Sequence, residues 1–318
     1  MLRRIPGVPG LLLTAAFLSP VIGGCGGGEN ITSFEGNSTV TLGLTGLGPL
    51  TGGLNYQAWL VVGTPTEFWG YPLVLFNVNE AGEMVSPAGD SILAGPFEAG
   101  VDASGVIGIG ISLEESDVLL NYSSYTFILG GEMVGGSAEL STESWLAFDQ
   151  SLSEAAGRYI LATPTDDDPA NELGGIWFMD SSVAPAARGL LIPDAPTGWN
   201  YESWVVLNDQ PLSMGKFVSP AEPDSANPHS GTAQSPAFPG EDFLTAAPAG
   251  ITFPADLAGA PVFITLEPWA EMDTEPENPF FLRIFGGSVP ADPTAETPYE
   301  LTSFTDQLPR GTASIQGT

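Results

Sequence analysis

The sequence predicts an all-β protein built from two related, tandem β-sandwich-like domains. Glycine and proline are frequent, with 40 and 29 residues, and they separate short apolar runs in which apolar and polar positions alternate. No long run repeats apolar residues at the i, i+3, i+4, i+7 spacing of an amphipathic helix. A set of motifs also recurs in the same order in both halves of the chain. Many short alternating runs with turn residues between them are typical of β-sandwiches and barrels.

The N-terminus is similar to a bacterial lipoprotein signal. Arg3 and Arg4 precede an apolar run, residues 11–18, and the segment SPVIGGC then ends at Cys25, the only cysteine. The run is shorter than the roughly 20 residues that span a bilayer. We therefore expect residues 1–24 to be a signal peptide, Cys25 to carry a lipid, and residues 25–38 to be a flexible, glycine-rich tether. An ordinary secretory signal or an uncleaved anchor are the alternatives.

The same pattern predicts where the protein resides. A lipid on Cys25 would attach an exported chain to a membrane, and Gly26 after the cysteine gives no aspartate signal for inner-membrane retention. We expect the outer membrane, on its periplasmic or its surface face.

The charge of the chain is strongly negative. Lys and Arg number 7 against 38 Asp and Glu, a net charge of −31. Such a surface repels nucleic acid and anionic lipid headgroups, so no nucleic-acid partner is expected. Charged residues are only 14% and apolar residues 43%, which excludes a disordered acidic tail. A soluble acidic envelope protein, a saline habitat and divalent-cation binding remain as explanations.

The predicted strands follow the alternating runs. In the first domain, residues 39–150, these are Val40–Leu47 and Val106–Leu113; in the second, residues 151–318, the clearest is Val262–Pro268. Each places its apolar side chains on one face, as a half-buried strand does. One short helix fits Ser151–Tyr159.

The repeat centres on a sequence motif that predicts a strand, a turn and a second strand. Asn-Tyr-x-x-Trp occurs at Asn55 and again at Asn200, and we interpret it as scaffold, because large aromatic side chains usually fill the core of a β-domain. The rival interpretation is an aromatic ligand platform. Glu114 and Glu267 end equivalent strands, which suggests a shared structural hydrogen bond or turn. The further matches are Pro72-Leu73 and Val78 with Pro211-Leu212 and Phe217, Ile111–Glu114 with Ile264–Glu267, and Phe127–Gly131 with Arg283–Gly287.

The second copy contains a set of motif residues that resembles a known family. These residues are Tyr201, Trp204, Val205, Val206, Pro211, Leu212, Ser213, Gly215, Phe217, Thr265, Leu266, Glu267 and Pro268. They resemble the C-terminal, extracytoplasmic domain of anti-sigma-K factors, and the first copy does so loosely. The resemblance implies a β fold and a sensing or binding heritage. That family also needs a cytoplasmic sigma-binding domain and one membrane-spanning helix, which we do not expect in this chain, so we expect no sigma-factor partner.

Calcium is the one cofactor that the sequence suggests. Asp166, Asp167 and Asp168 lie in a turn with Glu172 near them, and Ca²⁺ prefers several oxygen ligands from flexible acidic loops. The spacing is not that of an EF-hand, and a solvated acidic loop is the alternative. A second acidic stretch runs through residues 267–279.

Aromatic residues at expected hairpin tips suggest a binding surface. They are Phe68, Trp69, Tyr71 and Trp269, and exposed aromatic side chains there would mark contact with an envelope protein or a glycan. No catalytic motif is present, and the lone His229 is expected to be an exposed loop residue. We expect a non-catalytic protein that acts by binding or display. A carboxylate-based glycan hydrolase and a Ca²⁺-stabilised structural module are the alternatives.

Overall fold

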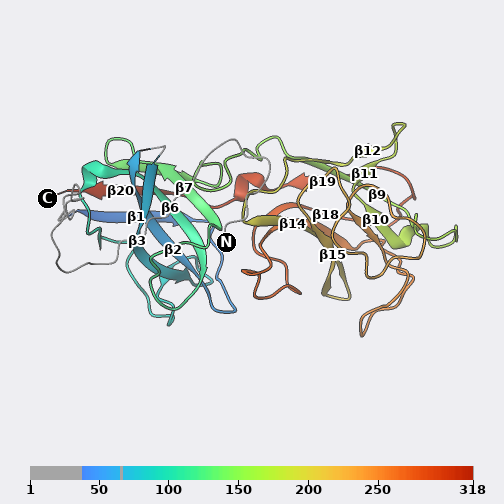
Figure 1. Cartoon of the computed structure of the whole chain (residues 1–318). Coiled ribbons are helices and arrows are strands. Elements are labelled where there is room, and N and C mark those ends of the chain that lie inside the picture. Colours follow the sequence, from blue (N-terminus) through green and yellow to red (C-terminus); the bar gives the residue numbers. More distant parts are fainter. Residues whose placement is uncertain (1–37, 65–66, 318) are drawn as a thin grey trace, which may run out of the picture.

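The computed structural model describes residues 38–64 and 67–317, and over these residues the fold is all-β. Two large, curled sheets lie side by side, as Figure 1 shows. The predicted fold class is therefore confirmed. The predictions for residues 1–37, including the signal peptide, the lipid on Cys25 and most of the tether, lie outside the described residues.

The first sheet contains strands from both ends of the described chain. Its strands are antiparallel throughout. In spatial order they are β4 (Met84–Val85), β3 (Glu67–Val78), β2 (Leu54–Thr64), β6 (Val106–Glu115), β7 (Phe127–Glu132), β8 (Ser137–Ser141), β20 (Arg310–Gln316), β1 (Thr39–Thr45) and β5 (Phe97–Glu98).

The second sheet has the same layout. Its strands in spatial order are β15 (Gln210–Phe217), β14 (Trp199–Leu207), β17 (Pro261–Pro268), β18 (Arg283–Ser288), β19 (Tyr299–Ser303), β9 (Ala156–Leu161), β10 (Gly175–Trp177) and β16 (Gly240–Asp242), with β13 (Leu190–Leu191) also paired to β9. A small ribbon joins β11 (Met179–Asp180) and β12 (Ala187–Arg188), and the short 3-10 turns are η1 (Ala103–Gly105), η2 (Glu172–Gly174) and η3 (Thr305–Gln307).

The predicted strands are present and the predicted helix is not. The three alternating runs correspond to β1, β6 and β17. The helix expected over Ser151–Tyr159 is wrong, because a turn leads there into β9. β9 pairs with β19, β10 and β13, and an added Cβ at Gly157 would meet the side chains of Leu301 and Leu190. Pairing and close packing with distant strands therefore decide the conformation of this segment.

The repeat is confirmed strand by strand. β2, β3, β6 and β7 correspond to β14, β15, β17 and β18, and each pair of central strands carries the same β-bulge, after Ile111 and after Ile264. One group of matches is wrong, because the two hairpins differ in length. Phe217 pairs with Tyr201 as Phe76, not Val78, pairs with Tyr56. Pro72 pairs with Trp59, whereas Pro211 pairs with Val206, so Pro72-Leu73 and Pro211-Leu212 are not equivalent either. Equivalent residues include Asn55 and Asn200, Tyr56 and Tyr201, Gln57 and Glu202, Trp59 and Trp204, Ser112 and Thr265, and Glu114 and Glu267.

The C-terminal strand completes the first sheet. β20 lies between β1 and β8, pairing seven residues with β1 and five with β8. In Figure 1 its red arrow lies among the blue and green strands of the first sheet. In the second sheet β9 takes this place, between β19 and β10. The expected boundary placed residues 310–316 in the second domain, whereas strand pairing places them in the first sheet.

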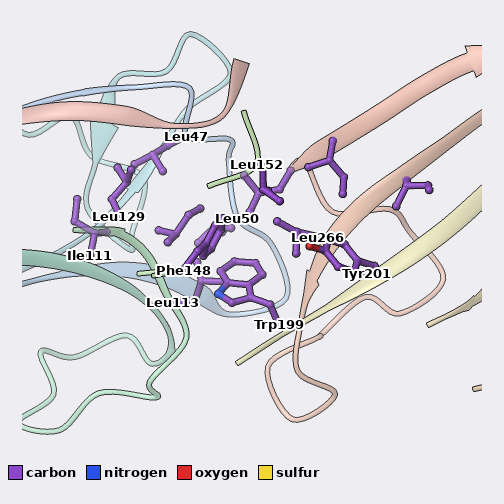
Figure 2. Packing of buried hydrophobic residues seen from close by; sticks show 14 of the residues in the cluster. Leu47, Leu50, Ile111, Leu113, Leu129, Phe148, Leu152, Trp199, Tyr201 and Leu266 are labelled. Atoms are coloured by element: carbon purple, nitrogen blue, oxygen red, sulfur yellow. The ribbon is translucent and has the colours of Figure 1, made fainter. Parts of the chain in front are cut away.

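One hydrophobic core continues from the first sheet into the second. Trp199 of β14 is buried where they meet, its ring 5.5 Å from that of Phe148 and 6.0 Å from that of Phe280. Its indole Nε1 donates a 3.0 Å hydrogen bond to the carbonyl of Phe127 in the first copy. Figure 2 shows Trp199, Phe148 and Leu152 packed between strands of the two sheets.

The part of the chain that the structure describes contains no helix with the length and hydropathy of a membrane span.

Candidate functional site

Each copy contains the same buried chain of hydrogen bonds, here called the relay. In the first copy, Trp59 Nε1 donates to Ser112 Oγ at 2.8 Å, and Ser112 Oγ donates to the Glu114 carboxylate. In the second, Trp204 Nε1 donates to Thr265 Oγ1 at 2.9 Å, and Thr265 Oγ1 donates to Glu267 at 2.5 Å. The relay side chains are buried, which confirms the interpretation of the aromatic phrase as scaffold.

The two relays end by holding equivalent loops, residues 116–126 after β6 and residues 269–282 after β17. Glu114 accepts backbone N–H bonds from Ser124 at 3.0 and 3.1 Å, and Glu267 accepts one from Phe280 at 2.8 Å. A carboxylate is a strong acceptor for backbone donors that burial removes from water. The predicted shared structural bond of these two glutamates is therefore confirmed, and we call the two segments the junction loops.

The copies differ in how the rest of each loop is fixed. In the first copy the amide of Gln57 bonds both the N–H and the carbonyl of Leu120, at 2.9 and 2.8 Å. In the second copy Glu202 replaces that glutamine, and Lys216 lies between the carboxylates of Glu202, at 3.4 Å, and Asp273. A neutral amide is thus replaced by an ionic network.

The junction loops carry much of the exposed apolar surface. Of the eleven large hydrophobic residues that are exposed in the described chain, five lie on these loops, and we call them the junction surface: Val118, Leu119, Tyr122, Tyr125 and Trp269. The bases of the loops abut at Gly198, whose carbonyl accepts from Trp269 N at 3.1 Å and whose added Cβ would lie 3.1 Å from the Tyr125 carbonyl.

Tyr125 adopts a backbone conformation that tyrosine rarely occupies. Its φ is +67°, in the left-handed region, while its side chain is 53% exposed. This conformation costs about 1–3 kcal/mol for a residue other than glycine. An exposed aromatic residue held at such a cost is an indication of function.

The predicted binding residues differ in their exposure to solvent. Trp269 is 45% exposed and belongs to the junction surface. Phe68 is partly buried, with its ring 5.3 Å from that of Trp145, and Tyr71 packs against the core. Trp69 is also partly buried on β3. Sequence reasoning missed Tyr122 and Tyr125, although their loop follows Glu114 as the loop of Trp269 follows Glu267.

The predicted calcium ligands act within their own loop. Asp166 accepts from Asp168 N at 3.2 Å and from Asn171 Nδ2 at 2.7 Å, Asp168 accepts from Ala170 N, and Glu172 accepts from Thr163 N at 3.0 Å. Asp167 is exposed. Among the described residues, the group of acidic side chains whose oxygens all lie within 4.8 Å of one another is a different one: Glu202, Glu267 and Asp273.

A further group of acidic side chains lies on and beside β16: Glu241 and Asp242 belong to the strand, and Asp224 accepts from Gly240 N at 2.8 Å. Trp177 Nε1 donates to Asp242 at 2.6 Å, and Ser230 Oγ donates to Glu241. Burial raises the pKa of Glu241 to about 8 and that of Asp224 to about 7. None of the three forms an ion pair with a cation in the described part of the chain.

The expectation of an exposed His229 is wrong. The residue is partly buried, with its ring centroid 5.2 Å from that of Phe253 and 5.9 Å from that of Phe243. Desolvation lowers its pKa. The loop around it folds over these two phenylalanines, and local composition does not reveal such packing.

The paired buried carboxylates and the surface hollow lie in different places. Glu202 and Glu267 are close enough to cooperate, but they are 2% and 1% exposed beneath a junction loop, where no sugar reaches them. A surface hollow of about 230 Å³ lies near η3. Its lining residues include no carboxylate: Gly46, Phe281, Leu282, Arg283, Phe304, Gln307, Leu308 and Pro309.

Comparison with family models, with curated proteins and with solved structures found no match.

Proposed function

We propose that the protein is a non-catalytic binding protein of the cell envelope, attached to a membrane by a lipid on Cys25, and that the junction surface is its binding site. The observation that carries this proposal is the gathering of Tyr122, Tyr125 and Trp269 on two equivalent loops that abut at Gly198. Buried carboxylates hold both loops, so the aromatic rings stand on a fixed base.

The chemistry of the surface favours a positively charged partner. The junction loops contain no Lys, Arg or His, and they carry the exposed acids Asp117, Glu271, Glu275 and Glu277. The faces of Trp and Tyr rings attract cations, by about 0.5–1 kcal/mol each at exposed sites. The chain as a whole has a net charge of −31, and this negative field steers cations toward it. We propose that the ligand is a Lys/Arg-rich segment of another envelope protein.

The relation to anti-sigma-K ectodomains belongs to the same proposal. Its residues, Tyr201, Trp204 and Glu267 among them, build the core and the relay, so the resemblance bears on the fold of each copy. The proposed activity is binding outside the cytoplasm, with no sigma factor as partner. We propose the outer membrane as the location.

The proposal is tested by the affinity of the purified protein for a Lys/Arg-rich peptide and for a Glu-rich peptide of equal length, at 150 mM salt. Replacing Tyr122, Tyr125 and Trp269 by serine is expected to weaken binding of the basic peptide at least tenfold, because three cation–π contacts of about 0.5–1 kcal/mol are lost. Leu93→Ser, at an 81% exposed residue outside the junction loops, is the matched control and should change nothing.

Two results would count against this assignment. If the triple variant and Leu93→Ser bound the basic peptide equally, the junction surface would not be the site. If the protein bound oligosaccharides through Tyr122 and Trp269 and ignored both peptides, the carbohydrate-binding alternative would replace it.

A further inference from the structure

We propose that Glu202, Glu267 and Asp273 form a binding site for a hard divalent cation such as Ca²⁺, and that Lys216 is the internal cation with which it competes. One oxygen from each of the three side chains lies within 4.8 Å of the others, as the ligands of one ion do. Glu202 and Glu267 are almost fully buried. The site lies beneath the second junction loop, which supplies Asp273, and the argument for it does not use the proposed function.

Hydrogen bonds hold the ligand side chains in place. Asp273 Oδ1 accepts from Glu275 N at 3.2 Å, and its Oδ2 binds the Lys216 ammonium. Glu267 Oε1 accepts from Thr265 and from Phe280 N, and Glu202 Oε1 accepts from Ser213 Oγ at 2.5 Å. Glu202 Oε2, fully buried, accepts no hydrogen bond from any residue that the structure describes, and it forms a 3.4 Å ion pair with the Lys216 ammonium. If Lys216 moved away, this buried oxygen would be left without a partner, which is costly, and a cation could take the place of the ammonium.

The first copy shows that the fold does not need these charges. Gln57 stands at the place of Glu202 and fixes its loop with two neutral hydrogen bonds. Leu75 stands opposite Gln57, where Lys216 stands opposite Glu202. The structural task of this position is therefore performed by an uncharged pair, and the second copy adds charge beyond that task.

The added charges do not balance. Three carboxylates face one ammonium, so the ionised cluster carries −2 in a buried place, which is unfavourable without compensation. A divalent cation bound between the three carboxylates would cancel the excess.

Lys216 is able to yield its place. Its side chain is 22% exposed, so the flexible stem has a route by which the ammonium can swing into water. The ligands are all oxygens, which favours Ca²⁺, Mg²⁺ or Mn²⁺ over softer metals. Because Lys216 must be displaced and few ligands come from the protein, we expect weak binding, with a Kd of about 10⁻⁴–10⁻³ M for Ca²⁺.

The test uses Tb³⁺, a luminescent substitute for Ca²⁺ that is sensitised by nearby tryptophan. Trp204 is one hydrogen bond from Thr265, which bonds Glu267, so Tb³⁺ in the site should emit when the intact protein is excited at its indoles. Ca²⁺ should reverse the emission. Trp204→Phe should reduce emission while leaving Ca²⁺ binding measurable by calorimetry.

Two variants are expected to change the affinity for the cation in opposite directions. Glu202→Gln, the residue of the first copy, should weaken binding at least tenfold, and Lys216→Met should strengthen it at least threefold by removing the competitor. Glu271→Gln, an exposed acid on the same loop, is the control and should leave binding unchanged. Circular dichroism checks that each variant is folded.

The outcomes separate a cation site from an ion network that only stabilises the loop. A purely structural network predicts that Glu202→Gln and Lys216→Met both destabilise the fold, with Tb³⁺ emission unaffected by either. Equal emission from the wild type, Glu202→Gln and Glu271→Gln, or no rise in affinity for Lys216→Met, would overturn the proposal.

Discussion

Removing β20 should loosen the first sheet, although this strand follows the second sheet in the chain. The perturbation is deletion of residues 309–318. Because β20 lies between β1 and β8, its loss leaves two unpaired strand edges about 170 and 270 residues earlier in the sequence. The control deletes only Gly317 and Thr318, beyond the last residue of β20.

The magnitude follows from what β20 contributes. Its twelve residue pairings correspond to about twelve ladder hydrogen bonds of roughly 1 kcal/mol net each, which slightly exceed the conformational entropy cost of seven ordered residues at about 1.5 kcal/mol each. Burial of Ile315 and Ala313 adds about 2–4 kcal/mol. We expect a net loss of about 4 kcal/mol in the local stability of the first sheet.

Hydrogen exchange measured by mass spectrometry reports this loss by position. A loss of about 4 kcal/mol corresponds to roughly a thousandfold lower protection in β1 and β8. The strands β18 and β19, which are near β20 in sequence but belong to the other sheet, should keep their protection. If β18 and β19 lost protection while β1 and β8 kept it, the closure of the first sheet by β20 would be refuted.

Two further predictions concern the buried polar groups. Trp59→Phe and Trp204→Phe should each cost about 2 kcal/mol in urea unfolding, since each removes the same indole bond and leaves a similar cavity; a cost in only one copy would contradict the equivalence of the relays. Stability should fall as pH rises from 5 to 8.5, because burial raises the pKa of Asp224 to about 7 and that of Glu241 to about 8, so the folded chain holds protons that the unfolded chain has lost. One unit of pKa is worth about 1.4 kcal/mol, so roughly two units for Asp224 and three for Glu241 above pH 5 give a loss of up to about 7 kcal/mol. Asp224→Asn with Glu241→Gln should reduce this loss, and an unchanged slope in that variant would refute the assignment.

Much of the fold follows from local pattern. The alternation in β1, β6 and β17 and the recurrence of Asn-Tyr-x-x-Trp are written in the sequence, and the strands and the repeat follow from them. The equivalence of Glu114 and Glu267 was also predictable, because both end the same strand of the repeat. These features depend on neighbours in the chain or on comparison of one half with the other.

The closure of the first sheet does not follow from local pattern. Alternation in β20 indicates a strand, but nothing in these residues says which sheet it joins, since its partners β1 and β8 are far away in the chain. The prediction of a helix over Ser151–Tyr159 was wrong for the same reason, because the pairing of β9 with β19 and β10 decides the conformation there.

The site shows the same limit. Lys216 and Asp273 are 57 residues apart, and only the folded chain brings them together with Glu202. Asp166 and Asp168, which are close in sequence, suggested calcium binding; in the structure both accept hydrogen bonds within their own loop, and the calcium prediction there stays a prediction. Spacing along the chain ranks local clusters first, whereas a site on a β-sheet is assembled from neighbouring strands.

The central claim is that the junction surface binds a basic segment of a partner. It is tested most directly by placing a photo-crosslinking amino acid at position 122 or 269 in intact cells, with position 93 as the control, and sequencing the crosslinked peptides. The account predicts one recurrent adduct from positions 122 and 269, absent at 93, whose crosslinked peptide is rich in Lys and Arg. Equal crosslinking from position 93, or recurrent adducts at 122 and 269 to acidic or uncharged peptides, would contradict it.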